Sequence, residues 1–429
     1  MLMPFDMLES KVRSYCRDFP TIFRHGRGEI LEDKDGRSWI DFFAGAGALN
    51  YGHNEPHIKS ALMEYLQEDN IIHGLDLATV AKGEFLERLL EIILQPRNLK
   101  YKVMFPGPTG TNAVEAALKL ARKSTGRTTV MSFVNGFHGM TLGSLAVTGN
   151  AGKRDGAGVP LQHVTRVPFD GYLNDGGDSL GWIQQLLEDH SSGIDKPAAF
   201  IVETVQAEGG VNVAGDRWLK GLQSLAREHG IILIVDDIQV GCGRTGPFFS
   251  FEQSGIEPDI VCLSKSLSGL GLPLSIVLLR PELDIFTPGQ HNGTFRGHNP
   301  AFVTAAATLD HFWRDDQLTS EVRSKGQEVR TFLKNLSDSR PDIRTRVRGL
   351  GLIQGIEFVD NPEIAEQVSH HAFDNGLIVE TAGGNSQVLK VLPPLNIPRD
   401  SLRKGLEIIG ESVDAVCPST MKHKVSHSR

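Results

Sequence analysis

Two apolar runs in the middle of the chain, each followed directly by charged side chains, constrain the fold more than any other feature. Residues 231–235 lead into Asp236 and Asp237, and residues 259–264 lead into Lys265. Continuous apolar runs of this length indicate strands that are buried on both faces, as in a mostly parallel sheet. Ligands bind such sheets beyond the carboxyl ends of the strands. Asp236 and Lys265 are therefore predicted to face a common site.

The segments around these runs predict an α/β architecture. Residues 198–205 have the pattern of another strand, and residues 216–229 have the apolar spacing of an amphipathic helix. At 429 residues the chain is too long for one small core. We expect a large domain at residues 56–315, with a smaller α+β lobe formed by residues 1–55 and residues 316–429.

The composition argues against several classes of function. Lys and Arg number 44 and Asp and Glu number 52, and the resulting net charge of −8 disfavours nucleic acid or an anionic membrane as a partner. No apolar run approaches the ~20 residues of a membrane-spanning helix, and the N-terminus lacks a signal-peptide core. The four cysteines show neither metal-ligand spacing nor a disulfide pattern. We therefore expect reduced thiols, no bound metal and a cytoplasmic location.

A carboxylate and a lysine at adjacent strand ends suit the cofactor pyridoxal 5'-phosphate. This cofactor forms a Schiff base with a lysine and needs an acid against its pyridinium nitrogen. Asp236 and Lys265 could supply both groups. A strand that ends in two acids is common, however, and a lysine after a strand usually lies on the surface. The prediction therefore depends on whether other segments supply the rest of such a site.

Three further segments could complete the site. Gly110 and Thr111 precede residues 113–123, which have a helical apolar stripe. The amides and dipole at a helix N-terminus suit a phosphate, although an ordinary helix cap is the simpler explanation. Phe137 lies in a Gly-Phe-His-Gly segment and could face an aromatic cofactor or belong to the core. Thr294, in a small polar loop, could donate its hydroxyl to the phosphate or lie in a surface turn.

Taken together, these segments resemble the class III aminotransferases, and the resemblance covers nearly the whole chain. The sequence DDIQVGCGRTG at residues 236–246, followed by Lys265 at the family's spacing, carries it most strongly. The family usually has Asp-Glu where this chain has Asp236-Asp237, and a register that starts from Asp237 matches less well. The resemblance implies the type I pyridoxal-phosphate transferase fold. It also implies a homodimer or higher homo-oligomer that acts on small amino acids and oxo acids.

The resemblance also implies which residues contact the cofactor. These are Gly110, Thr111, Phe137, His138, Asp236, Gln239, Lys265 and Thr294. Lys265 would carry the Schiff base, Asp236 would pair with the pyridine nitrogen, and Gln239 would approach the ring hydroxyl. Phe137 would stack on the ring. Thr294 would reach the phosphate from the partner subunit.

Three charged residues match family positions near the substrate. Many relatives place an arginine before a Pro-Pro-Leu element to clamp a substrate carboxylate, and this chain has Lys390 there. Lysine offers a point charge in place of a bidentate fork. Lys390 could bind more loosely, another group could replace it, or it could be surface charge. Glu203 and Glu208 match two family acids, the second of which can screen the clamp, and Thr204 replaces a usual proline.

The chemistry follows from these parts. Freed Lys265 would move the α-proton as general base and acid, while ionised Asp236 would keep the ring protonated. A finer resemblance, at residues 12–17, 41–56 and 107–115, is to a subgroup of ectoine biosynthesis. It implies amino transfer from L-glutamate to L-aspartate 4-semialdehyde, giving L-2,4-diaminobutyrate and 2-oxoglutarate. Two alternatives stay open: an ω-aminotransferase for ornithine or 4-aminobutyrate, and a non-catalytic interaction protein on the same fold.

Overall fold

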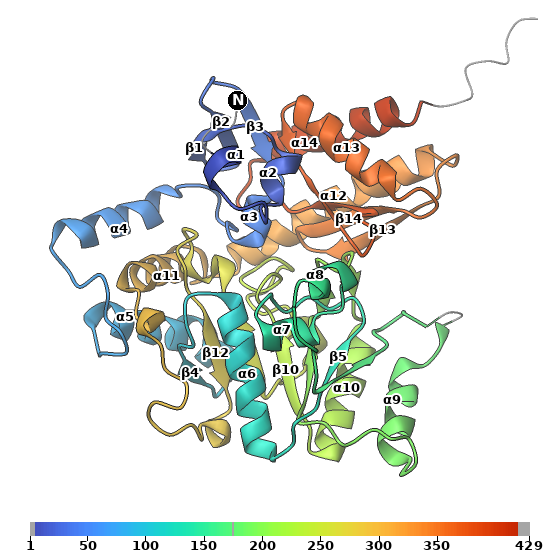
Figure 1. The fold of residues 1–429 in the computed structure, drawn as a ribbon. Helices are drawn as coiled ribbons and strands as arrows, with labels where there is room; N and C mark the ends of the chain where they lie inside the picture. Colours follow the sequence, from blue (N-terminus) through green and yellow to red (C-terminus); the bar gives the residue numbers. More distant parts are fainter. Residues whose placement is uncertain (1–4, 174–175, 419–429) are drawn as a thin grey trace, which may run out of the picture.

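A seven-stranded sheet forms the centre of the computed structural model, which describes residues 5–173 and 176–418 (Figure 1). Its strands are, in spatial order, β4 (Lys102–Met104), β12 (Ile276–Leu279), β11 (Ile260–Leu263), β10 (Ile232–Asp236), β7 (Ala199–Val202), β5 (Val130–Phe133) and β6 (Val164–Val167). β10 pairs in parallel with β7 and β11, and β5 does so with β6 and β7. Only β12 runs antiparallel to its neighbours, β4 and β11. The predicted mostly parallel sheet is confirmed.

Helices cover both faces of this sheet, which explains the continuous apolar runs. Successive side chains of a strand point to opposite faces. Ile234 accordingly packs in the core beneath α6 (Gly110–Thr125), whereas Leu233 and Val235 pack in the core that contains α10 (Asp216–His229). Figure 1 shows α6 crossing the near face of the sheet. Because neither face meets water, no residue of these strands needs to be polar until the strand ends.

Two predicted boundaries shift for local reasons. The helix expected at residues 113–123 begins at Gly110 because Thr109 caps it, and the strand expected at residues 198–205 divides after Val202. Its last part joins a short antiparallel pair, β8 (Val205–Gln206) with β9 (Asn212–Val213).

A smaller part of the molecule combines the two ends of the chain. Its sheets are β1 (Phe23–Arg27), β2 (Ile30–Asp33) and β3 (Ser38–Asp41) with β15 (Leu377–Ile378), and β13 (Thr345–Leu350), β14 (Ile353–Phe358), β17 (Val388–Val391) and β16 (Glu380–Ala382). Its long helices are α12 (Gln317–Ser339), α13 (Glu363–Asp374) and α14 (Arg399–Val416). Figure 1 shows the blue N-terminal strands beside the orange and red C-terminal helices, above the central sheet. This arrangement supports the predicted lobe, while its boundaries at residues 55 and 316 stay a prediction.

The remaining helices connect or flank these sheets. They include α1 (Phe5–Leu8), α2 (Tyr15–Asp18), α3 (Ala44–Gly47), α4 (Pro56–Gln67), α5 (Val80–Arg88), α7 (Leu142–Val147), α8 (Ala151–Asp155), α9 (Ser179–Glu188) and α11 (Asn299–Phe312). Short 3-10 turns follow β11, at Lys265–Ser268, and precede α11, at Thr294–Arg296. Among the described residues, no helix has the length and apolar character needed to span a membrane.

Candidate active site

A cavity of about 160 Å³ lies beyond the carboxyl ends of β10 and β11. It is lined by Gly110, Thr111, Phe137, His138, Gly139, Glu203, Asp236, Ile238, Gln239, Val240 and Lys265. The fold thus brings together residues that the sequence separates widely. Of the predicted site residues outside this lining, Glu208 accepts a hydrogen bond from Gln239 and another from Lys390, and Thr294 lies elsewhere.

Asp236, the last residue of β10, is held from two sides at the floor of the cavity. The residue is 4% exposed, its Oδ2 lies 2.8 Å from His138 Nδ1, and its Oδ1 accepts a hydrogen bond of 3.2 Å from the Ile238 N–H. Asp237 turns away from the cavity and accepts hydrogen bonds from the amide and hydroxyl of Ser250. Burial raises the pKa of Asp237 to about 7. The geometry therefore favours the register in which Asp236 is the acid of the site.

Lys265 follows β11 directly and has an unusual backbone conformation, with φ at +50°. Residues with side chains rarely adopt this region, and such strain is often found at functional sites. Its Nζ donates a hydrogen bond of 2.9 Å to the Ala46 carbonyl oxygen. Burial lowers the pKa of Lys265, and the charge of Lys390 adds to this effect while Glu208 opposes it. A lowered pKa favours the neutral amine, which is the nucleophilic form.

The N-terminus of α6 offers free donors to an anion. Thr109 caps the helix together with Asn112, whose Oδ1 accepts from the Thr109 amide at 3.1 Å and from its hydroxyl at 2.8 Å. The amides of Gly110 and Thr111 have no acceptor within the described residues. The Thr111 hydroxyl, 2.7 Å from that of Thr141, lies on the same side. Free amides and a helix dipole suit a phosphate, so this end of the cavity fits the phosphate of the predicted cofactor.

Phe137 and Glu203 form one wall of the cavity. The Glu203 carboxylate accepts a hydrogen bond of 2.9 Å from the Phe137 amide, which fixes the loop that presents the ring. Burial, followed by the charge of Asp236, raises the pKa of Glu203 well above its usual value. Outside this wall, the Lys153 ammonium lies 5.5 Å from the centre of the Phe137 ring.

Lys390, on β17, lies between two carboxylates. Its Nζ is 2.7 Å from Glu208 Oε1 and 2.8 Å from Glu380 Oε1. The side chain is fully buried, so the surface-charge alternative is wrong. Burial alone would lower the pKa of Lys390, but the two acids hold it above its usual value. Burial alone would likewise raise the pKa of Glu208, but Lys390 and Lys265 lower it to about 2.

Gln239 connects this charged group to the cavity lining. Its Nε2 donates hydrogen bonds of 2.8 Å to the Ala46 carbonyl oxygen and 2.9 Å to Glu208 Oε1.

Glu380 is a residue that the sequence did not single out. It faces Lys390 in the antiparallel register of β16 and β17. The short strand β16, Glu380–Ala382, has no pattern that marks a partner in β17, so the sequence carried no local signal for Glu380.

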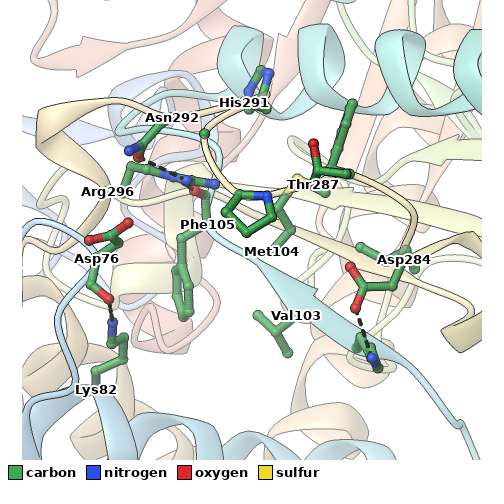
Figure 2. Close-up of a pocket in the computed structure, with 15 residues that line it drawn as sticks. Asp76, Lys82, Val103, Met104, Phe105, Asp284, Thr287, His291, Asn292 and Arg296 are labelled. Atoms are coloured by element: carbon green, nitrogen blue, oxygen red, sulfur yellow. Dashed lines mark hydrogen bonds and ion pairs between the residues drawn. The ribbon is translucent and has the colours of Figure 1, made fainter.

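Thr294 is exposed and does not line this cavity. Its loop borders a second pocket of about 420 Å³, which Figure 2 shows with Asn292 and Arg296 among its lining residues. The two cavities share no lining residue. Within a single chain, the structure therefore does not bring Thr294 to the other predicted cofactor contacts.

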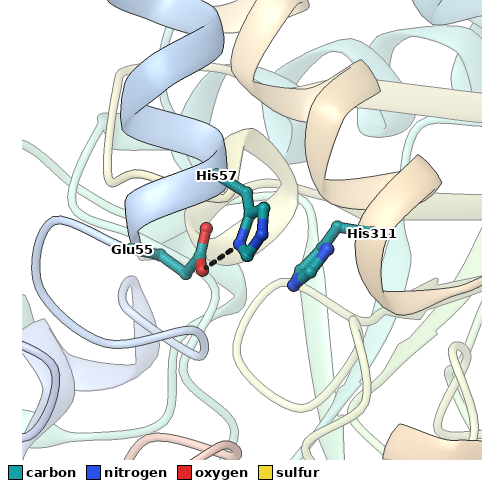
Figure 3. A group of neighbouring side chains, drawn as sticks. All are labelled: Glu55, His57 and His311. Atoms are coloured by element: carbon teal, nitrogen blue, oxygen red, sulfur yellow. Dashed lines mark hydrogen bonds and ion pairs between the residues drawn. The ribbon is translucent and has the colours of Figure 1, made fainter.

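A group of possible metal ligands lies outside the cavity, where α4 meets α11. Figure 3 shows Glu55, His57 and His311, whose donor atoms lie within 4.8 Å of one another. The imidazole rings stack at 3.9 Å with 24° between their planes, so their lone pairs run side by side and do not converge. One oxygen of Glu55 accepts from the Ile58 amide and caps α4. A helix cap and a ring stack account for this group.

Comparison with protein families agrees with the geometry. The family model of the class III aminotransferases matches residues 14–413. The chain belongs to this family. The family depends on pyridoxal phosphate, so the predicted cofactor and the predicted type I fold are confirmed.

Two kinds of relatives are informative. Diaminobutyrate–2-oxoglutarate transaminase from Nocardia farcinica is 57% identical over 96% of this chain and 94% of its own, and the enzyme of that name from Marinococcus halophilus is 51% identical over 97% of both chains. Among solved structures, the ornithine aminotransferase of Toxoplasma gondii ME49 superposes with a TM-score of 0.83 at 26% identity, over 96% of this chain and 94% of its own.

Proposed function

We propose that this chain transfers the amino group of L-glutamate to L-aspartate 4-semialdehyde, giving L-2,4-diaminobutyrate and 2-oxoglutarate. The observation that carries the proposal is the placement of Asp236, Lys265 and the free amides of α6 around one cavity. Full-length relatives named diaminobutyrate–2-oxoglutarate transaminase support the choice of substrate. The resemblance of residues 12–17, 41–56 and 107–115 supports a place in ectoine biosynthesis, and we also propose a cytoplasmic location.

Each group of the site has a distinct task in this reaction. Pyridoxal phosphate, when bound, supplies the electron sink. The Gly110 and Thr111 amides would hold its phosphate, and Asp236, oriented by His138, would keep a proton on its ring nitrogen by opposite charge. The Lys265 amine would take the proton from the reacting carbon of the amino acid and hold it for the return step. Its lowered pKa suits the neutral form that accepts the proton.

Lys390 and Glu208 would let the site bind its two different substrates in turn. Glu208 neutralises Lys390 in the structure and is also held by Gln239. If Glu208 turned away, Lys390 would keep its contact with Glu380 and could bind a carboxylate of glutamate or 2-oxoglutarate in the place of Glu208. With the ion pair closed, the site would accept a substrate that lacks a carboxylate at that position. An ion pair that opens and closes lets one cavity serve both halves of the reaction.

A substrate comparison tests the proposal directly. With 2-oxoglutarate as acceptor, diaminobutyrate should give a higher kcat/KM than ornithine or 4-aminobutyrate. Activity on the other two donors is expected, since one methylene is worth only about 1–3 kcal/mol of discrimination. A higher kcat/KM with ornithine or 4-aminobutyrate would reject the substrate assignment and leave the aminotransferase assignment intact. Absence of turnover with every donor would favour the non-catalytic alternative.

The proposed active unit is a homodimer in which Thr294 reaches the partner's cofactor phosphate. The loop containing Thr294 lies against residues 71–77, since the Gly74 amide donates to the Gly297 carbonyl oxygen at 2.8 Å. The apolar residues exposed along these two segments and at the start of α5 are Ile71, Ile72, Leu75, Leu77, Val80 and Phe295. Neighbouring exposed apolar side chains of this kind are typical of an interface, and a second copy of the chain would cover them.

Mixed dimers provide the test of this arrangement. Lys265→Ala and Thr294→Ala should each be poorly active alone, whereas mixing them should restore part of the activity. A Thr294→Ser variant serves as the matched control because it keeps the hydroxyl. A fully active monomer in analytical ultracentrifugation would contradict the shared site.

A further inference from the structure

The short turn α3 (Ala44–Gly47), labelled in Figure 1, has a backbone conformation that is rare in proteins. All four residues have positive φ, with values of +47°, +59°, +54° and +83° for Ala44, Gly45, Ala46 and Gly47. A left-handed turn is costly for residues that carry a Cβ atom, and two of these four are alanines. Such strain persists only where the surrounding structure holds it in place.

Asp41, the last residue of β3, holds the start of this turn. The residue is 1% exposed, and its Oδ1 accepts hydrogen bonds of 2.8 Å from the amides of both Phe43 and Ala44. Its Oδ2 lies 2.8 Å from His53 Nε2, so the carboxylate is fixed from the other side as well. One buried side chain thus supplies the acceptor for both amides at the start of the turn.

The far end of the turn presents two carbonyl oxygens to the segment that carries Lys265. The Ala46 carbonyl accepts a hydrogen bond of 2.9 Å from Lys265 Nζ, and the Gly47 carbonyl accepts one of 2.6 Å from Ser266 Oγ. Consecutive carbonyls therefore meet consecutive side chains. The Ala46 carbonyl also accepts from Gln239 Nε2 at 2.8 Å, which its two lone pairs allow. Two side chains of the cavity lining thus share one acceptor on the turn.

A fixed acceptor suits an amine that has to take a proton. A neutral amine that donates one N–H to a carbonyl keeps its lone pair free, while the hydrogen bond limits where the nitrogen can move. A general base must lie within hydrogen-bond reach of the proton that it takes, and a displacement of about 1 Å can cost about 100-fold in rate. The position of the Ala46 carbonyl would therefore decide how well the Lys265 amine is placed.

We propose that Asp41 is a positioning residue for proton transfer, because it holds the strained turn whose Ala46 carbonyl fixes the freed Lys265 amine. The inference rests on the proposed role of Lys265. It gives a task to residues that lie outside the cavity lining. It also explains why the strain is kept, since a relaxed loop would let the carbonyl, and with it the amine, move. Ser266 fastens the same turn from the side of the lysine.

The first test compares Asp41→Ala with Asp33→Ala. Asp33 is a matched control because it ends the preceding strand, is also 1% exposed, and accepts from the amides of Asp35 and Arg37 through one oxygen. The rate is measured in a single turnover with L-glutamate alone, followed by the absorbance of the bound cofactor. Asp41→Ala should lower the maximal rate roughly ten- to hundredfold and change the half-saturating glutamate concentration by less than about threefold. Asp33→Ala should keep both values within about threefold of wild type.

A second pair of variants approaches the turn from the lysine side. Ser266→Ala removes the donor to the Gly47 carbonyl and should lower the maximal rate by roughly three- to tenfold. Ser268→Ala is its matched control in the same 3-10 turn. The Ser268 hydroxyl is buried and makes no hydrogen bond within residues 5–173 and 176–418, so its loss should leave the rate unchanged.

The lysine itself provides a readout that does not depend on turnover. Competitive acetylation of the full chain freed of cofactor, followed by peptide mapping, gives the pH at which half of Lys265 is reactive. A carbonyl acceptor favours the ammonium form, so its loss should lower this pH by about half a unit or more in Asp41→Ala. The midpoint should stay at the wild-type value in Asp33→Ala. A turn that served only the stability of the fold would not move it.

The outcomes decide between positioning and a purely structural role. An unchanged rate in folded Asp41→Ala, or a lower rate without a shift of the Lys265 midpoint, would overturn the proposal. An equal loss of rate in Asp33→Ala would overturn it too. If Asp41→Ala does not fold, the two serine variants decide by the same two measurements. Failure of the proposed role of Lys265 is visible separately, as a pyridoxyl label on another lysine after borohydride reduction of wild type.

Discussion

The cofactor end and the substrate end of the cavity are built in different ways. At the cofactor end, Asp236 and Lys265 stand at the ends of neighbouring parallel strands, and the α6 amides are fixed by the helix itself. At the substrate end, Glu208, Glu380 and Lys390 are held mainly by one another. On the proposed assignment, backbone geometry would set the cofactor chemistry, whereas a set of ion pairs would set the choice of substrate. Variants at the cofactor end should lower turnover, whereas variants at the substrate end should change KM for the substrates.

The largest effect is expected at the cofactor end, from Lys265→Ala. Removing the amine removes both the attachment point and the acid–base group, so turnover should fall by at least about 10⁴-fold. The fold should persist, because within residues 5–173 and 176–418 the side chain makes one hydrogen bond, to Ala46. Borohydride reduction and peptide mapping of wild type should place the pyridoxyl label on Lys265. A label on another lysine would contradict the assignment.

Asp236→Asn should lower kcat by about 10²- to 10³-fold, the range for loss of one preorganised electrostatic contact. The amide keeps the shape of the side chain but loses the charge that holds the ring proton. Asp237→Asn is the control, since Asp237 faces Ser250 and not the cavity. The assignment of the two acids is reversed if Asp237→Asn is inactive while Asp236→Asn has wild-type activity.

A smaller and more selective effect is expected at the substrate end, from Lys390→Ala. KM for glutamate and 2-oxoglutarate should rise roughly tenfold or more, while cofactor affinity changes little, because Lys390 does not line the cofactor cavity. Stability should also fall, by about 3–5 kcal/mol, since two buried acids lose their cation. Lys390→Arg should restore most of the stability. Unchanged KM values for both dicarboxylates would show that another group binds the carboxylate.

The same contrast explains what could be predicted from the sequence. The local sequence pattern predicts Asp236, Lys265 and the start of α6, because each lies where an apolar run ends or a capped helix begins. Glu380 and Lys390 meet through the pairing of β16 with β17, and Glu208 reaches Lys390 from between β8 and β9. Lys390 and Glu208 were predicted by resemblance alone, and Glu380 was missed because nothing in its own strand marks the partner opposite. Thr294 stays a prediction, since its proposed contact lies on another chain.

The smallest effect on activity is expected from Asp237→Asn, which should instead change how stability depends on pH. Burial raises the pKa of Asp237 from its usual 3.8 to about 7, so the folded state binds this proton more tightly than the unfolded state does. The stabilisation that this provides is complete below pH 3.8 and is lost as the pH rises through 7. Asparagine cannot ionise and escapes the loss.

Relative to wild type, Asp237→Asn should therefore become more stable as the pH rises from 5 to 8.5, by a few kcal/mol at about 1.4 kcal/mol per pKa unit. Thermal melts of both proteins at several pH values measure the difference, with the exposed Asp374→Asn as control. A difference in melting temperature that stays constant over this range would mean that Asp237 is already ionised at pH 5. In that case Ser250 would stabilise the charge strongly enough to offset the burial.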